Sequence, residues 1–114
     1  MRKSRSMRRH LLSSGMTTCF YCGLPFNTGI PQPGTPGAAR ARRYAGITLE
    51  HLQAVACDGA TTKENCVVAH AWCNTTAANK PLEKKLQLKD VLSANGGIPP
   101  WWPVIEKIMQ NQKG

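Results

Sequence analysis

The sequence predicts a small α+β domain with long loops, two short central strands and C-terminal helices. Three observations support this fold class. Residues 46–56 and 65–69 are rich in branched apolar side chains and have the length of strands, helix-forming sequence follows them, and two pairs of Cys and His flank them. With 114 residues the chain fits one domain, and the thin core of so small a domain is often supplemented by a metal or a partner chain.

The first sixteen residues form a basic segment without an acidic side chain. Its positive side chains are Arg2, Lys3, Arg5, Arg8 and Arg9. This composition is typical of a solvated cationic tail, and it also suits an organellar transit peptide. We expect a flexible basic arm over residues 1–16 and a folded domain over residues 17–114.

Residues 24–45 are dominated by Pro, Gly and small side chains, which predicts a long loop. Residues 46–56 then have the length of one strand or of a bent pair, and residues 57–63 resemble a turn. A second short strand is expected over residues 65–69, directly before His70. We therefore expect a hairpin at the centre of the chain.

Helix-forming sequence begins at Asn74. The apolar stripe expected on this helix consists of Leu82, Leu86, Leu88, Val91 and Leu92. Asn95-Gly96-Gly97 should end the helix, because glycine readily takes the left-handed conformation found after helix ends. Pro99-Pro100 should prevent the helix from resuming, and a last short helix is expected from Pro103 as a C-terminal extension.

The chain is strongly basic, since 15 Lys and Arg face six Asp and Glu and give a formal net charge of +9. Such an excess favours polyanionic partners, because binding releases counterions from a nucleic-acid backbone. A basic protein without such a partner is the alternative, and charge alone indicates no activity. We expect DNA, in double-stranded form, as the partner.

The chain has five cysteines, an odd number that cannot pair completely in disulfides. It has neither the apolar stretch of a secretory signal nor one of transmembrane length. We therefore expect no membrane association and a reducing, cytoplasmic compartment, for a protein encoded by a bacterium or a phage. In such a compartment, clustered Cys and His more often bind a metal than form disulfides.

Two pairs of residues have the two-residue spacer of a zinc knuckle. They are Cys19-x-x-Cys22 and His70-x-x-Cys73. A structural zinc ion takes four such ligands in a tetrahedron, so we expect the two pairs to bind one Zn²⁺. Cys57 or Cys66 could instead replace His70 as a ligand. Cys-x-x-Cys could also be a redox pair, although Gly23-Leu24-Pro25 argues against the helix that follows such a pair.

Between the two pairs and just after them lie a carboxylate, an imidazole and two amides: Glu50, His51, Asn65 and Asn74. Phosphodiester hydrolysis needs an activated water and positive charge at the scissile phosphate. A neutral His can accept a proton from water, and a Glu carboxylate with an Asn carbonyl suits a hard divalent cation. Adjacent residues of a strand point to opposite sides, so Glu50 and His51 would need an irregular backbone to converge.

The order Cys-x-x-Cys, Glu-His, Asn and His-x-x-Cys-Asn resembles the HNH endonuclease family, in the variant whose third motif residue is Asn. The resemblance covers roughly residues 19–82 and is specific because several motifs match together. It implies a ββα-metal core, stapled by the zinc pairs, that hydrolyses DNA with Mg²⁺ or Mn²⁺ to a 5′-phosphate and a 3′-hydroxyl.

The resemblance also implies a role for each motif residue. His51 corresponds to the general base, and Glu50 and Asn74 correspond to ligands of the catalytic cation. Asn65 corresponds to the residue that braces the loop beside the base. Each has a structural alternative: His51 could be a structural histidine, Asn65 could cap a turn, and Asn74 could cap a helix.

The sequence departs from the family pattern at two positions, since Ala54 replaces a common Pro and Gly59 stands for a common Gly pair. Neither change removes a chemical group. Basic side chains near the site are expected to contact DNA phosphates, namely Arg40, Arg42, Arg43 and Lys80. Lys84 and Lys85 could do the same or form a solvated helix face.

Three functions compete on these observations. The first is a metal-dependent endonuclease that nicks or cuts DNA, and the second is a non-catalytic, zinc-stapled DNA-binding module. The third is an accessory protein of a phage or recombination assembly, or a homodimer, with the apolar stretch around Trp101 as its docking surface. The joint presence of Glu50, His51 and Asn74 favours the nuclease, because a binding module does not need all three.

Overall fold

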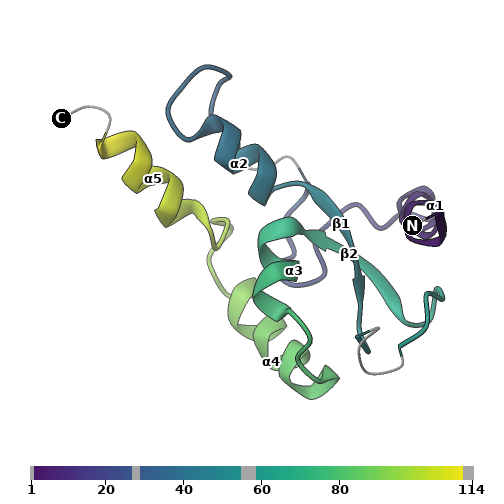
Figure 1. Ribbon diagram of the computed structural model, residues 1–114. Coiled ribbons are helices and arrows are strands. Elements are labelled where there is room, and N and C mark those ends of the chain that lie inside the picture. Colours follow the sequence, from purple (N-terminus) through teal and green to yellow (C-terminus); the bar gives the residue numbers. More distant parts are fainter. Residues whose placement is uncertain (1, 27–28, 55–58, 112–114) are drawn as a thin grey trace.

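The computed structural model describes residues 2–26, 29–54 and 59–111 (Figure 1). Cys57, one of the alternative zinc ligands, lies outside these residues. The described part has the mixed α+β composition that the sequence predicts. Its elements are α1 Arg2–Ser13, α2 Ala38–Tyr44, β1 Ile47–His51, β2 Cys66–His70, α3 Ala71–Ala77, α4 Leu82–Ser93 and α5 Trp102–Asn111.

The two strands form an antiparallel sheet in which His51 at the end of β1 lies opposite Cys66 at the start of β2. Helix α3 follows β2 directly, and the Ala71 amide at this junction donates a hydrogen bond to the Gly46 carbonyl (2.8 Å). The predicted pair of strands is therefore confirmed. The helix begins earlier than the predicted start at Asn74, because that hydrogen bond anchors its first residue to the hairpin.

The N-terminal segment differs from the flexible arm that its composition predicts. Residues 2–13 form α1, and Leu11 of this helix is only 2% exposed and packs with Val68 of β2. The Arg8 guanidinium donates to the Ile47 carbonyl of β1 (3.3 Å). Met7 and Leu11 lie one turn apart, so they share the helix face that covers the hairpin. The arginines around them dominate the composition and conceal this short apolar stripe.

The predicted long loop over residues 24–45 ends in a helix, α2, which packs against α5 (Figure 1). Ala41 and Ala45 are buried against Trp101 and Ile105 at this contact. The small side chains that suggested a loop are therefore the residues that let two helices approach closely. Trp101 is completely buried, whereas Ile98 and Val104 of the same apolar stretch are exposed. The docking surface expected around Trp101 stays a prediction.

Two helices, α3 and α4, occupy the region in which the sequence predicts one continuous helix. Asn95-Gly96-Gly97 follows the end of α4, as predicted, and α5 begins at Trp102, one residue before the predicted start at Pro103. The apolar stripe on α4 is only partly buried. Leu88 and Leu92 pack inward. Three of its predicted members are instead exposed, namely Leu82, Leu86 and Val91.

The molecule is elongated, with principal extents of 48 × 27 × 24 Å. Figure 1 shows the hairpin and α3 between α1 on one side and the α2–α5 pair on the other. Within residues 2–26, 29–54 and 59–111, no helix has both the length and the apolar character needed to cross a bilayer. The hairpin and α3 are therefore the framework on which the polar residues of the chain are placed.

Candidate functional site

The four residues of the two predicted zinc pairs come together in one buried cluster. They are Cys19, Cys22, His70 and Cys73, and their ligand atoms all lie within 4.8 Å of one another. The first pair sits on a tight turn in which the Gly23 amide donates to the Cys19 carbonyl (2.9 Å). His70 ends β2 and Cys73 lies in the first turn of α3. The junction of strand and helix therefore brings the second pair to the first.

The atoms of the cluster are arranged as ligands of one ion. The Cys22 Sγ lies 3.3 Å from His70 Nδ1, and the His70 amide donates to the Cys19 Sγ (3.3 Å). His70 Nδ1 is therefore the nitrogen that faces the sulfurs. In the described part of the chain His70 Nε2 is buried without a hydrogen-bond partner. Three thiols and one imidazole match the Cys₃His set of structural zinc sites.

Hydrogen bonds within the cluster shift the pKa values of its members in opposite directions. Hydrogen bonds from Cys22 and Cys73 hold the pKa of the Cys19 thiol far below its ordinary value. Hydrogen bonds with Cys19 and Cys22 have the opposite effect on Cys73 and raise its pKa. Burial disfavours protonated His70, but hydrogen bonds to the sulfurs outweigh it and raise the His70 pKa to about 9. A structural zinc ion binds thiolates and neutral imidazole, so its binding here would release the protons of Cys73 and His70. The buried Cys₃His set is compatible with such an ion.

Cys66 is not part of the cluster. It is buried in β2 with Leu11 and Val68, and burial raises the pKa of its thiol. The alternative in which Cys66 replaces His70 as a ligand is therefore wrong. Cys66 behaves as a small apolar side chain of the core.

Glu50 of β1 is 4% exposed and lies in a buried chain of polar groups. The Tyr21 hydroxyl donates to Glu50 Oε2 (2.5 Å), and the Lys85 ammonium lies 3.5 Å from Glu50 Oε1. Burial, together with the Glu50 carboxylate, raises the Tyr21 pKa well above its ordinary value, so the phenol stays protonated. Tyr21 lies between Cys19 and Cys22, so these contacts join the Cys₃His cluster to β1 and α4.

Lys85 was expected to contact DNA or to lie on a solvated helix face, and both expectations are wrong. Its side chain is completely buried, and its ammonium donates to the His51 carbonyl (2.5 Å) beside Glu50. The spacing of Lys85, Leu88 and Leu92 could have indicated that Lys85 lies on the buried face of the helix, because the three share one helix face. No pattern in the sequence indicated that the Tyr21 hydroxyl would contact Glu50.

His51 and the loop after it are held by side-chain hydrogen bonds. His51 Nε2 lies 2.9 Å from Thr61 Oγ1. Asn65 accepts from the Gln53 amide (2.8 Å) and donates to the carbonyls of Gln53 (3.0 Å) and Ala60 (2.8 Å). Asn65 thus closes the loop next to His51. Its role in bracing a catalytic base stays a prediction.

Gly59 has a steric reason to be glycine. Its amide donates to the Ala54 carbonyl (2.9 Å), and a Cβ at this position would lie 1.7 Å from the Gln53 oxygen. Any side chain would collide with this backbone. Gly59 therefore stands where the backbone passes close to Gln53 and Ala54.

Glu50, His51 and Asn74 line one cleft of about 430 Å³ between the hairpin and α3, together with Leu49, Ala54, Thr75, Ala78 and Asn79. The Asn74 amide nitrogen donates to Thr48 Oγ1 (3.1 Å) and to the Leu49 carbonyl (3.0 Å). These bonds orient the amide, so its Oδ1 is left to accept a ligand. Glu50 and His51 have different side-chain partners, as expected for neighbours in a strand, but both border this cleft.

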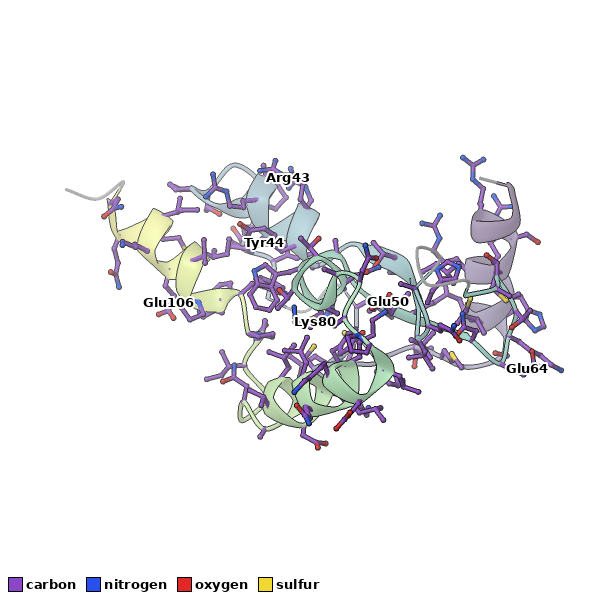
Figure 2. The ribbon with its side chains drawn as sticks, turned by 60° about the horizontal axis from the view of Figure 1, so that its bottom comes forward. Arg43, Tyr44, Glu50, Glu64, Lys80 and Glu106 are labelled. Atoms are coloured by element: carbon purple, nitrogen blue, oxygen red, sulfur yellow. The ribbon has the colours of Figure 1, made fainter. Side chains whose placement is uncertain are left out.

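The four basic residues predicted to contact phosphate are exposed. Arg40, Arg42 and Arg43 lie on α2, and Lys80 follows α3, where its ammonium donates to the Thr76 carbonyl (3.0 Å). Across the described ranges, the Lys85–Glu50 contact is the one ion pair, so these arginines carry uncompensated charge. Figure 2 shows Arg43 and Tyr44 at the end of α2, with Glu50 and Lys80 on the hairpin side of the molecule.

No protein-family model matches the chain, and no curated protein and no solved structure matches it either. The resemblance to HNH endonucleases therefore rests on the motif residues alone. What the structure adds is their arrangement, namely a buried Cys₃His cluster and, beside it, a cleft lined by a carboxylate, an imidazole and an amide.

Proposed function

We propose that the protein is a metal-dependent endonuclease of the HNH type that hydrolyses phosphodiester bonds in DNA. The observation that carries the proposal is the cleft shared by Glu50, His51 and Asn74. These residues come from the end of β1 and from α3, and the Asn65 hydrogen bonds hold the loop beside His51. The Cys₃His cluster, occupied by zinc, would fix the junction of β2 and α3.

His51 is the proposed general base. With Nε2–H donating to Thr61 Oγ1, the lone pair of the neutral ring lies on Nδ1, which would take the proton from the attacking water. The side chain is half-buried, so water can reach it. The Lys85 ammonium holds the His51 carbonyl and thereby fixes the backbone at the base.

Asn74 Oδ1 and the Glu50 carboxylate are the oxygen donors that would hold Mg²⁺ or Mn²⁺. When bound, the cation supplies positive charge at the scissile phosphate and at the leaving oxygen. Both donors border the cleft, which supports the assignment. Lys85 lies 3.5 Å from Glu50 Oε1 and repels a second positive charge, so we expect weak cation binding that requires an excess of the metal.

A non-catalytic DNA-binding module is the second candidate function, and the same ion pair favours it. Glu50 is buried and already neutralised by Lys85 and Tyr21, as in a purely structural network. In this alternative the exposed arginines of α2 bind phosphates, and the cleft binds no cation.

Supercoiled plasmid distinguishes the two candidates. Zinc-loaded protein is incubated with the plasmid at increasing Mg²⁺ or Mn²⁺, and binding is followed in parallel by gel shift. The nuclease converts the plasmid to nicked or linear DNA with 5′-phosphate ends, and the conversion rises with metal concentration. Binding without conversion at any metal concentration would contradict the proposal and favour the binding module.

A further inference from the structure

A second cleft adjoins the proposed catalytic cleft along α3. It has a volume of about 400 Å³ and is lined by Arg43, Tyr44, Ala71, Trp72, Thr75 and Thr76. Thr75 lines both clefts. The two hollows therefore meet at Thr75. None of the functions considered so far uses the second cleft.

Two aromatic side chains from different elements line this cleft. Tyr44 ends α2 and Trp72 lies in the first turn of α3, and both are half-buried. The Tyr44 ring packs near Trp101, with ring centroids 6.0 Å apart, and Trp72 packs against two core clusters. Both rings are thus supported from behind by the core while part of each borders the cleft. Rings held in this way stack on a planar ligand at little cost in side-chain entropy.

The charged member of the cleft is Arg43. Its side chain is exposed, and in the described ranges its guanidinium makes no hydrogen bond or ion pair. Arg40 and Arg42 add positive charge to the same helix. Figure 2 shows Arg43 at the outer edge of α2 and Tyr44 on the side toward the rest of the molecule, and both line the cleft. An unpaired guanidinium next to aromatic rings suits a ligand with both a phosphate and a planar base.

We propose that this cleft binds one unpaired nucleotide of the substrate strand, adjacent to the phosphodiester bond cut in the first cleft. Its base would stack on Tyr44 or Trp72, and its phosphate would contact Arg43. Stacking on a side chain needs an exposed base face, which a base within a duplex does not offer. The inference rests on the proposed function, and it adds that the preferred substrate has an unpaired base, as in a bulge or at a junction with single-stranded DNA.

Two other ligands would use fewer of the side chains that line the cleft. A clamp for the duplex backbone would use Arg43 but would need neither aromatic ring. A protein partner could occupy the same hollow, but the charge of +9 on the chain and the free arginine favour a polyanion. The DNA strand is the ligand that uses all three side chains.

The test measures binding without cleavage, in the His51→Ala protein with zinc present. A short fluorescein-labelled duplex is compared, by fluorescence anisotropy, with the same duplex carrying a single-thymine bulge. We expect the bulged duplex to bind about tenfold more tightly, the gain expected from one stacked base. Tyr44→Leu and Trp72→Leu should reduce this preference several-fold while leaving affinity for the plain duplex unchanged. Trp102→Leu, whose ring does not line the cleft, is the matched control and should keep it.

Because Trp72 and Tyr44 contact the core, Thr75→Glu provides a test that does not disturb packing. Thr75 is exposed, and an acidic side chain there should repel the strand and abolish the preference for the bulge. Equal binding of both duplexes by the parent protein would overturn the proposal, as would a preference that survives all three cleft variants. A bulge preference without plasmid cleavage would instead refute the proposed hydrolysis and leave the subsite standing.

Discussion

The Cys₃His cluster and the proposed catalytic cleft lie on the same hairpin and helix, yet they are built in opposite ways. The cluster is fully buried and its four soft ligands face one another. The cleft is open, its donors are hard oxygens and an imidazole, and its carboxylate is partly neutralised by Lys85. A closed set of soft ligands suits a metal that stays in place, and an open set of oxygens suits one that exchanges with solvent and substrate.

The two regions are nevertheless coupled through one side chain. Tyr21 lies between two cluster cysteines and donates its hydroxyl to Glu50 in the cleft. Damage to the cluster should therefore affect the fold and the cleft together, whereas damage to the cleft should leave the cluster intact. The predictions below test this asymmetry, beginning with the largest effect.

Removal of the zinc site should have the largest effect. A structural zinc contributes on the order of 10 kcal/mol, which is as large as the whole stability of a typical domain. We expect Cys73→Ser, or extraction of zinc by a chelator, to unfold the protein, as measured by zinc content and circular dichroism. Cys66→Ala is the matched control, because it changes a buried cysteine outside the cluster. It should keep the zinc, and a folded, zinc-free Cys73→Ser protein would contradict the structural role.

Loss of the buried ammonium should have the next largest effect. Lys85→Met leaves Glu50 as a buried, unpaired carboxylate, and we expect a loss of about 3 kcal/mol in the free energy of unfolding. Lys84→Met changes the neighbouring, exposed lysine and should cost less than about 0.5 kcal/mol. Urea denaturation measures both. Zinc content should be the same in both variants. Equal stability of the two variants would show that the Lys85–Glu50 contact contributes nothing.

Asn65→Ala removes three hydrogen bonds from the loop beside His51. We expect the free energy of unfolding to fall by about 1.5 kcal/mol, and plasmid nicking to fall about tenfold or more because the base loses its position. Asn95→Ala serves as the control, since Asn95 donates one exposed hydrogen bond, to Ile98. A variant that nicks at the wild-type rate would remove the bracing role from Asn65.

The smallest effect concerns the ionisation of Tyr21. Its pKa is raised in the folded protein, so the stability it contributes is present below the unfolded pKa of about 10 and is lost as the pH rises beyond it. In a Tyr44→Phe protein Tyr21 is the sole tyrosine. We expect phenolate absorbance to appear only as the protein unfolds at alkaline pH. Ionisation near pH 10 with unchanged circular dichroism would mean that Tyr21 is not buried against Glu50.

Local patterns in the sequence were sufficient for the strands and the Cys₃His cluster, whereas Glu50, His51 and Asn74 of the cleft were assigned their roles through the family resemblance. Spacing in the chain determines which ligands can reach one ion, and branched apolar residues determine the strands. The structure differed where tertiary contacts outweigh composition. Arginines concealed the apolar face of α1, the alanines of α2 resembled loop residues, and Lys85 was buried because Glu50 lies opposite it.

The central claim is that His51 acts as a base in the cleft, and one comparison tests it most directly. His51→Ala and His10→Ala are both loaded with zinc and incubated with supercoiled plasmid and Mn²⁺. His10 is an exposed histidine on α1, so its loss matches the change of side chain without touching the cleft. We predict that His51→Ala abolishes nicking while it keeps its zinc and its affinity for DNA, and that His10→Ala nicks like the wild type. Equal nicking by the two variants would contradict the assignment of His51.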